Sequence, residues 1–316
     1  MTDTPNGVKG SLLLAWQVRD KHCLVIGAGD VALSRINHLI LAQAKITVVT
    51  GETKEPHPSI LKLNSEGRIH NFVQRNYENN DLIMYESTKP TVNFRNITPK
   101  DFSEISSLSN ETFACVCCCI DDYELSTKIY YQCKLLRLPV NIADKPPLCD
   151  FYFGSMFNRD NLQIMISTNG KSPRLSKMIK DNIAKEFDGV DLNNAIENLG
   201  MIRSRLRQLI LIDDDLVTID TRMNWIKTLT DFFTLKQWSE LQLVPETLLE
   251  PPHDNRFMYV DRIIKYFPDY PPQNYETFKS TIFESEIEED KEDDEDDDKE
   301  GQVKEVETSL ENLSIE

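Results

Sequence analysis

The side chain best suited to chemistry in this chain is the carboxylate of Asp144. It lies just past the apolar run Val140–Ile142, and Pro146 and Pro147 come soon after it. We expect Val140–Ile142 to be a strand of a parallel sheet, and open α/β sheets bind their ligands at the carboxyl ends of their strands. The prolines stiffen the turn because they fix φ. Asp144 is therefore predicted to stand at a ligand-binding edge, where a carboxylate can accept a proton.

A glycine-rich turn near the start of the chain indicates the ligand of that edge. His22–Ile26 is predicted to be a short strand, and Gly27-Ala28-Gly29-Asp30-Val31-Ala32 follows it at once. This is the G-x-G-x-x-A form of the dinucleotide fingerprint, in which the first glycine permits a tight turn and the second lets the backbone approach a pyrophosphate. The helix that follows offers free N–H groups to the phosphates.

An acidic residue follows the second predicted strand, Lys45–Thr50. Glu52 lies 23 positions after Gly29, near the offset at which an acidic residue meets the adenosine ribose. In that role it would favour NAD over NADP, because a carboxylate repels a 2′-phosphate. The alternative is an ordinary solvated glutamate of a loop. The predicted cofactor-binding residues are Gly27, Gly29, Asp30, Val31, Thr50, Gly51 and Glu52.

The elements around these motifs predict an α/β fold with a Rossmann-like parallel sheet. A third strand is expected at Ile69–Val73, and Thr112–Ile120 is a continuous apolar run of the kind that is buried in a parallel sheet. Between them, residues 78–110 are polar and irregular, which indicates an insertion. Further on, apolar stripes at helical spacing predict a helical C-terminal part and no chemistry of its own.

A second candidate binding region lies at the start of a later helix. The predicted strand Leu162–Ile166 leads into Ser167–Arg174, where Ser172 is a good N-cap and Pro173 a good first helical residue. Lys171 and Arg174 would place cations at this helix N-terminus, which predicts a cradle for an anion or a carboxylate. The alternative is simple capping with a solvated basic face.

The net charge of −17 comes mostly from the C-terminus, where Glu284–Glu300 alone holds thirteen acidic residues and two lysines. Such a run cannot bury enough apolar surface to fold, so residues 281–316 are predicted to be a disordered acidic tail. The tail either keeps the protein in solution or contacts a basic partner. The remaining body is close to neutral, and nothing in the sequence predicts nucleic-acid binding.

The seven cysteines indicate buried thiols of a cytoplasmic protein and not a disulfide framework. Cys117, Cys118 and Cys119 lie in a predicted strand, where adjacent side chains point to opposite faces and cannot converge on one ion. The five histidines show no metal-ligand spacing either. Met1–Gly10 is polar and no apolar run is long enough to span a bilayer, so we predict no secretory signal, no membrane span and no resident metal.

Taken together, four motifs resemble those of the fungal siroheme-synthesis enzymes, which are bifunctional precorrin-2 dehydrogenases and sirohydrochlorin ferrochelatases. The similarity is strong over residues 10–190 and holds in outline through the helical part that follows. The glycine motif is shared by many families, whereas the block around Asp144 and Tyr152 is much more specific. The four motifs are Gly27–Ala32, Asn141–Pro146, Cys149–Gly154 and Ile166–Arg174.

This resemblance implies a homodimer and two reactions. The reactions would be NAD⁺-dependent oxidation of precorrin-2 to sirohydrochlorin and insertion of Fe²⁺, as a substrate, to give siroheme. Asp144 would serve both steps as the catalytic residue, and the residues predicted to bind the tetrapyrrole, which carries many carboxylates, are Thr168, Asn169, Lys171 and Arg174. The implied domains are a Rossmann-like domain at 1–143, a small α+β dimerisation domain at 144–190 and an α-helical C-terminal domain at 191–280.

Two other functions fit the same motifs. The protein could be a precorrin-2 dehydrogenase without chelatase activity, because chelation requires no residue beyond Asp144 that the sequence could reveal. It could also be a non-catalytic NAD-binding regulator that uses the acidic tail to bind partners. The intact Asp144 and the basic segment Lys171–Arg174 count against the regulator, since a sensor needs neither.

Overall fold

The computed structural model describes residues 11–87, 92, 95–210, 216–244 and 254–283. Residues 284–316, which make up nearly all of the predicted acidic tail, lie outside the described residues. The chain forms two compact units, Met1–Phe153 and Gly154–Glu316, and each is described by itself.

The first unit is built on a five-stranded, fully parallel sheet in the order β3-β2-β1-β4-β5. The chain moves outward from β1 to one edge of the sheet and then returns to the other side of β1, so the topological switch lies between β1 and β4. The predicted Rossmann-like α/β fold is confirmed. The strands are β1 (His22–Ile26), β2 (Lys45–Thr50), β3 (Asn71–Gln74), β4 (Cys115–Cys118) and β5 (Val140–Ile142).

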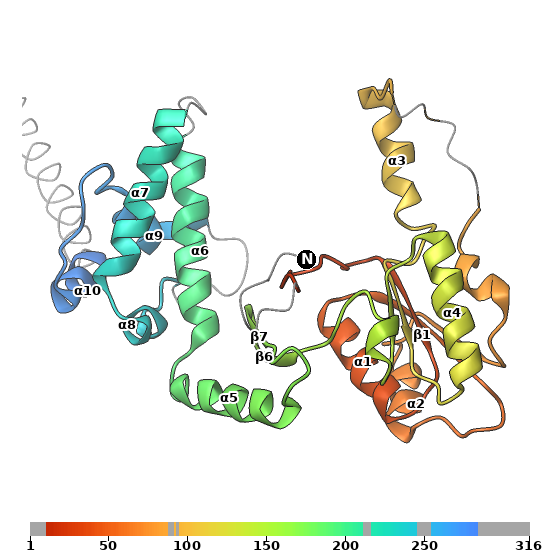
Figure 1. The fold of residues 1–316 in the computed structure, drawn as a ribbon. Helices are drawn as coiled ribbons and strands as arrows, with labels where there is room; N and C mark the ends of the chain where they lie inside the picture. The colour runs from red at the N-terminus through yellow and green to blue at the C-terminus, as the bar shows by residue number, and fades with distance from the viewer. Residues whose placement is uncertain (1–10, 88–91, 93–94, 211–215, 245–253, 284–316) are drawn as a thin grey trace, which may run out of the picture. The chain divides into compact units, whose positions relative to one another are not determined.

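Alternating side chains of the strands bury the two faces of this sheet against different helices. Cys23 and Val25 pack with α1 (Asp30–Leu41) and α2 (Pro58–Ser65), whereas Leu24 and Ile26 pack with α4 (Tyr123–Leu136). Figure 1 shows α1 and α2 on one side of β1 and α4 on the other. Continuous apolar strands are required here because both faces of the sheet are covered.

The described residues between β3 and β4 form only short helices, as the polar sequence of this segment predicts. These are the 3₁₀ helices η1 (Asn79–Ile83) and η2 (Pro99–Asp101), followed by α3 (Phe102–Leu108). Another short 3₁₀ helix, η3 (Pro146–Leu148), lies beyond β5. β3 begins two residues later and ends one residue later than predicted, since its pairing with β2 runs from Asn71 to Gln74; Ile69 is buried just ahead of it.

The second unit contains an antiparallel hairpin and a set of helices. β6 (Ser155–Arg159) pairs with β7 (Leu162–Ile166), and α5 (Pro173–Glu186) packs against them. The helical part has its own core around Trp225, Trp238 and Phe278. Its elements are α6 (Leu192–Leu209), α7 (Leu216–Phe232), α8 (Leu235–Glu240), η5 (Asp254–Phe257), α9 (Met258–Ile264) and α10 (Tyr275–Phe283).

A buried histidine lies at the start of β1. His22 is 6% exposed, its ring stacks on Tyr85 with 3.9 Å between centroids, and His70 lies 5.2 Å away. Its Nδ1 atom is buried without a hydrogen-bond partner among the described residues. Burial lowers the pKa of His22, and the charges of His70 and Lys45 lower it further. The folded protein therefore holds this imidazole neutral.

This histidine is expected to make stability depend on pH. The pKa of His22 is lower in the folded than in the unfolded state, so the unfolded chain binds the extra proton first as the pH falls. Above pH about 6.5, the ordinary histidine pKa, His22 should add no pH dependence to the free energy of unfolding. Below that pH the free energy of unfolding should fall. His22→Phe keeps a ring against Tyr85 and should flatten this part of the curve. Urea denaturation of both proteins from pH about 7.5 to about 5 measures the free energy of unfolding across the ordinary histidine pKa. Parallel curves for the two proteins would contradict the assignment of this pH dependence to His22.

Candidate active site at the carboxyl edge of the sheet

The turn after β1 is held in place by its neighbours. Gly27 has φ +105°, a conformation that side chains other than glycine rarely adopt, and an added Cβ would collide with the carbonyl oxygen of Cys119. The N–H of Gly27 donates to the carbonyl of Val49 at 2.8 Å, and the N–H of Cys119 donates to Ile26 at 2.7 Å. The first glycine of the fingerprint is therefore required by the fold itself.

The second glycine of the fingerprint is not required by the protein's own packing. Gly29 is the N-cap of α1 at φ −90°, and no atom of the described residues lies within 4 Å of an added Cβ. No described side chain caps the helix there, so the N–H groups of the first turn, which begins with Asp30 and Val31, are open. Open space in front of uncapped N–H groups fits the pyrophosphate of a dinucleotide.

The end of β2 carries three of the residues that the sequence predicts to bind the cofactor. Thr50 is buried, and an added Cβ on Gly51 would lie 2.7 Å from Oδ1 of Asn76. Glu52 is exposed and forms no hydrogen bond or ion pair with any of the residues described. Its carboxylate is thus accessible for a ribose hydroxyl.

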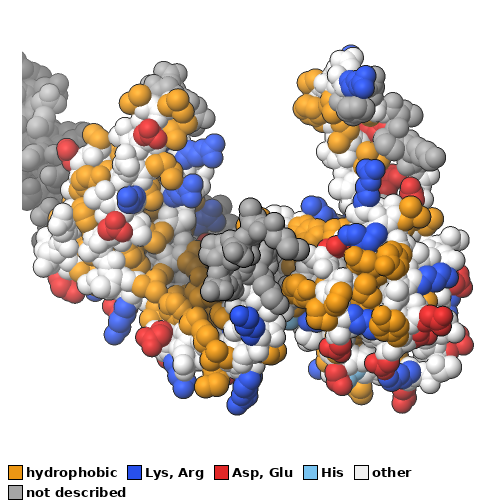
Figure 2. All heavy atoms as spheres, in the orientation of Figure 1, with side chains coloured by type: hydrophobic (Ala, Val, Ile, Leu, Met, Phe, Trp, Pro, Cys, Tyr) orange, Lys and Arg blue, Asp and Glu red, His pale blue; other side chains and the backbone are white. Residues whose placement is uncertain are grey.

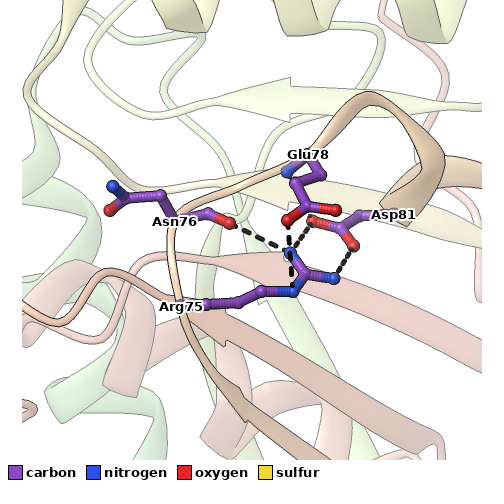
Figure 3. Close-up of polar contacts among 4 residues, drawn as sticks. All are labelled: Arg75, Asn76, Glu78 and Asp81. Carbon is purple, nitrogen blue, oxygen red and sulfur yellow. Dashed lines mark hydrogen bonds and ion pairs between the residues drawn. The ribbon is translucent and has the colours of Figure 1, made fainter.

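The loop that carries Asn76 is fixed by an arginine that sequence reasoning did not single out. Arg75 donates from Nη2 and Nη1 to the two carboxylate oxygens of Asp81, at 2.6 and 2.9 Å, and Nη1 also donates to the carbonyl of Asn76 (Figure 3). Asp81 is 1% exposed and accepts the N–H of Glu78 as well. Only the folded loop reveals this pair, since nothing in the sequence relates Arg75 to Asp81.

Removing the buried partner of this pair should destabilise the first unit. Asp81→Ala removes the acceptor of two hydrogen bonds from Arg75, which keeps its bond to the carbonyl of Asn76, and the acceptor of the N–H of Glu78. This loss should lower the free energy of unfolding by about 2 kcal/mol. Asp101→Ala is the matched control, because Asp101 closes the same kind of capping box at the exposed η2. Asp101→Ala should lower the free energy of unfolding by about 1 kcal/mol or less. Equal losses in chemical denaturation would show that the ion pair adds nothing to the capping box.

Asp144 lies at the same edge as the glycine turn. Ile26, Cys118 and Ile142 are neighbours across β1, β4 and β5, so the residues that follow these strands form one row. The N–H of Ala143 donates to the carbonyl of Cys118 at 2.9 Å, and Asp144 comes next with an exposed side chain and φ +58°. The structure thus brings the predicted catalytic residue and the predicted cofactor turn to one edge.

The thiol of Cys119 reports the charges around this edge. Burial raises the pKa of Cys119 to about 12, the positive charge of Arg35 opposes that shift, and the negative charge of Asp144 adds to it. The charges of Arg35 and Asp144 therefore both act on the thiol of Cys119, which comes directly after β4.

The segment after Asp144 is anchored by hydrogen bonds to the end of the sheet. The thiol of Cys149 donates to the carbonyl of Ile142 at 3.1 Å, and Nδ2 of Asn141 donates to Phe151 at 2.9 Å. The hydroxyl of Tyr152 donates to Pro146 at 2.9 Å. The residues of this block together hold the turn that presents the carboxylate.

The residues predicted to bind the tetrapyrrole belong to the second unit. Oγ1 of Thr168 lies 3.0 Å from Oγ of Ser176 and accepts the N–H of Ser172 at 3.2 Å, so this hydroxyl holds the loop against α5. Asn169 adopts φ +51° in the turn. Lys171 and Arg174 are exposed and form no ion pair in the part of the chain that the structure describes. The start of α5 thus presents two cations to solvent.

Within the described ranges, no group of three or more His, Cys, Asp or Glu side chains could hold a metal ion. Over the same ranges, no helix has the length and apolar character needed to cross a membrane.

Comparison with known proteins assigns the family. Residues 14–155 match an NAD(P)-binding family, residues 159–186 the central part of sirohaem biosynthesis proteins, and residues 190–256 their C-terminal part. A siroheme biosynthesis protein of Schizosaccharomyces pombe is 32% identical over 83% of this chain and 82% of its own. The chain belongs to the family of fungal siroheme biosynthesis proteins. Its relative in Saccharomyces cerevisiae is 34% identical over 72% of this chain and 84% of its own.

More distant relatives match over shorter parts. Siroheme synthase of Psychrobacter arcticus is 26% identical over 53% of this chain, which corresponds to 25% of that protein. The solved structure of SirC, a precorrin-2 dehydrogenase, superimposes with a TM-score of 0.43 at 19% identity and covers 69% of this chain and 100% of its own. The family assignment rests on the family models and the two yeast relatives.

Proposed function

We propose that this protein catalyses two successive steps of siroheme biosynthesis. It oxidises precorrin-2 to sirohydrochlorin with NAD⁺ and then inserts Fe²⁺ into sirohydrochlorin to give siroheme. The observation that carries the proposal is the exposed carboxylate of Asp144, which follows β5 at the same edge of the sheet as the uncapped N-terminus of α1. Membership of the fungal siroheme biosynthesis family supplies the substrate class.

In the first step the protein binds the cofactor and receives a proton. Gly29 and the N–H groups of Asp30 and Val31 hold the pyrophosphate, and the end of β2 at Thr50, Gly51 and Glu52 takes the adenosine ribose. Bound NAD⁺ supplies the hydride acceptor. Asp144 accepts the proton that precorrin-2 loses together with the hydride, so the products are sirohydrochlorin, NADH and one proton.

In the second step the same carboxylate acts without the cofactor. Iron insertion displaces two pyrrole protons, and Asp144 accepts them as Fe²⁺ enters and passes them to water. Thr168 and Asn169 line the substrate loop, and Lys171 and Arg174 attract the carboxylates of the macrocycle, since both are cations without an ion-pair partner among the described residues. Iron is a substrate in this scheme and needs no permanent site.

Two variants test the two steps, one by affecting both and the other by affecting only the first. Asp144→Asn keeps a residue that tolerates φ +58° and should lower both rates about 100-fold or more. Gly29→Asp has room to fold but fills the pyrophosphate space, so it should abolish NADH formation from precorrin-2 and spare iron insertion. NADH absorbance measures the first step, and the siroheme spectrum with sirohydrochlorin and Fe²⁺ but no NAD⁺ measures the second.

The wild-type protein also discriminates between the alternatives. Formation of NADH without siroheme would indicate a dehydrogenase alone, and binding of NAD⁺ without either product would indicate a regulator. Unchanged turnover by Asp144→Asn would contradict the role of Asp144 as proton acceptor and would leave the family assignment in place.

The proposal includes a homodimer that uses α5. Leu175, Met178 and Ile179 are 47, 52 and 38% exposed and share one face of this helix. Hydrophobic side chains are visible at the surface around α5 in Figure 2. An apolar helix face of this kind is typical of a contact with another chain.

A charge on this face should shift the oligomeric state. Met178→Glu is expected to give monomers in sedimentation velocity at concentrations where the wild type is dimeric, because a carboxylate would be buried in the contact. Lys177→Gln changes the neighbouring residue on another face of α5 and should leave the dimer intact. A wild type that sediments as a monomer would contradict the proposal.

Three further predictions from the sequence are part of this proposal. They are the domain limits 1–143, 144–190, 191–280 and 281–316, the cytoplasmic location and the preference for NAD. The family models change near residues 155 and 190, which supports a separate central segment.

A further inference from the structure

Arg35 lies on α1 and carries a charge that the described residues do not neutralise. None of them forms a hydrogen bond or an ion pair with its side chain, and its buried Nε atom has no partner among them. Burying part of a guanidinium without an anion costs free energy. Lone arginines are usually solvated at the surface, so a half-buried one without a counter-charge requires an explanation.

The position of this guanidinium is fixed by stacking. Its Cζ atom lies 4.3 Å from the centroid of the Phe153 ring. Phe153 in turn contacts Phe151, with 5.6 Å between ring centroids, and His38, with 5.3 Å. Cation–π stacking stabilises the arrangement, which offsets part of the desolvation. The stack holds the arginine in one orientation before any ligand arrives.

The charge of Arg35 acts on two thiols at the edge of the sheet that carries the candidate active site. Burial raises the pKa of both Cys119 and Cys149, and the positive charge of Arg35 opposes the shift in each. Cys119 also senses the carboxylate of Asp144. Arg35 stacks on Phe153, two residues after Phe151, whose carbonyl accepts a hydrogen bond from Asn141 of β5. It forms no ion pair with Asp144 within the described residues.

We infer that Arg35 binds a carboxylate substituent of the tetrapyrrole and so sets the position of the macrocycle relative to Asp144. This inference rests on the proposed function. The planar guanidinium matches a carboxylate in a bidentate arrangement. Arg35 is a binding residue in this assignment and exchanges no proton. A phosphate of the dinucleotide presents similar chemistry, but it has the open N–H groups of α1 around Gly29.

The test compares two ligands on the same variants. Arg35→Met keeps an unbranched chain against Phe153 and removes the charge, and Arg68→Met removes an exposed charge of the same unit as the matched control. Sirohydrochlorin is titrated by its absorbance, and NAD⁺ by calorimetry. We expect the Kd for sirohydrochlorin to rise about tenfold in Arg35→Met, with the Kd for NAD⁺ unchanged and with neither altered in Arg68→Met.

Arg35→Lys keeps the charge but loses the planar, bidentate donor group. Its Kd for sirohydrochlorin should therefore lie between those of the wild type and Arg35→Met. This variant also keeps the inference testable if Arg35→Met does not fold. An unchanged Kd for sirohydrochlorin in both variants would overturn the inference, and so would a loss confined to NAD⁺, which would identify a phosphate as the ligand. A wild type that neither binds sirohydrochlorin nor inserts iron would instead contradict the proposed function.

Discussion

The contact between Gly27 and the carbonyl of Cys119 is the constraint on which the site depends. It occurs where the chain leaves β1, and a hydrogen bond from Gly27 to Val49 completes it on the other side. Because β1 is the central strand, this turn has to fit between the ends of two neighbours. The same fit directs the N-terminus of α1 toward the edge and brings the residues after β4 close to it.

The carboxylate of Asp144, which we propose to be catalytic, is positioned in a different way. The side chain of Asp144 has no hydrogen-bond or ion-pair partner among the described residues, and the backbone on both sides of it is held by bonds from Ala143, Cys149 and Tyr152. An exposed acid on a rigid turn keeps its freedom to exchange protons while its location stays fixed. The backbone around Asp144 is thus held by hydrogen bonds while its side chain stays accessible to solvent.

The sequence could predict elements whose signals are local, and it failed where contacts are distant. β1, β2, β5 and β7 were predicted at their observed limits, because each is a short apolar run next to a turn signal. α2 was missed because its cap is His57, an unusual N-cap, and β6 was missed because it alternates poorly and gains its stability from β7. Asn76 and Arg35 acquire their meaning only from neighbours far along the chain, so no spacing rule could have found them.

The left-handed backbone at Asp144 has a consequence for how this family can vary. Aspartate and asparagine are among the few residues that accept φ near +58° at low cost, and only aspartate also brings an ionisable group. Glutamate would offer the same acid on a longer arm, in a conformation that it disfavours. An exchange of aspartate for glutamate at this position therefore carries a backbone cost of about 1–2 kcal/mol that a position with negative φ would not impose.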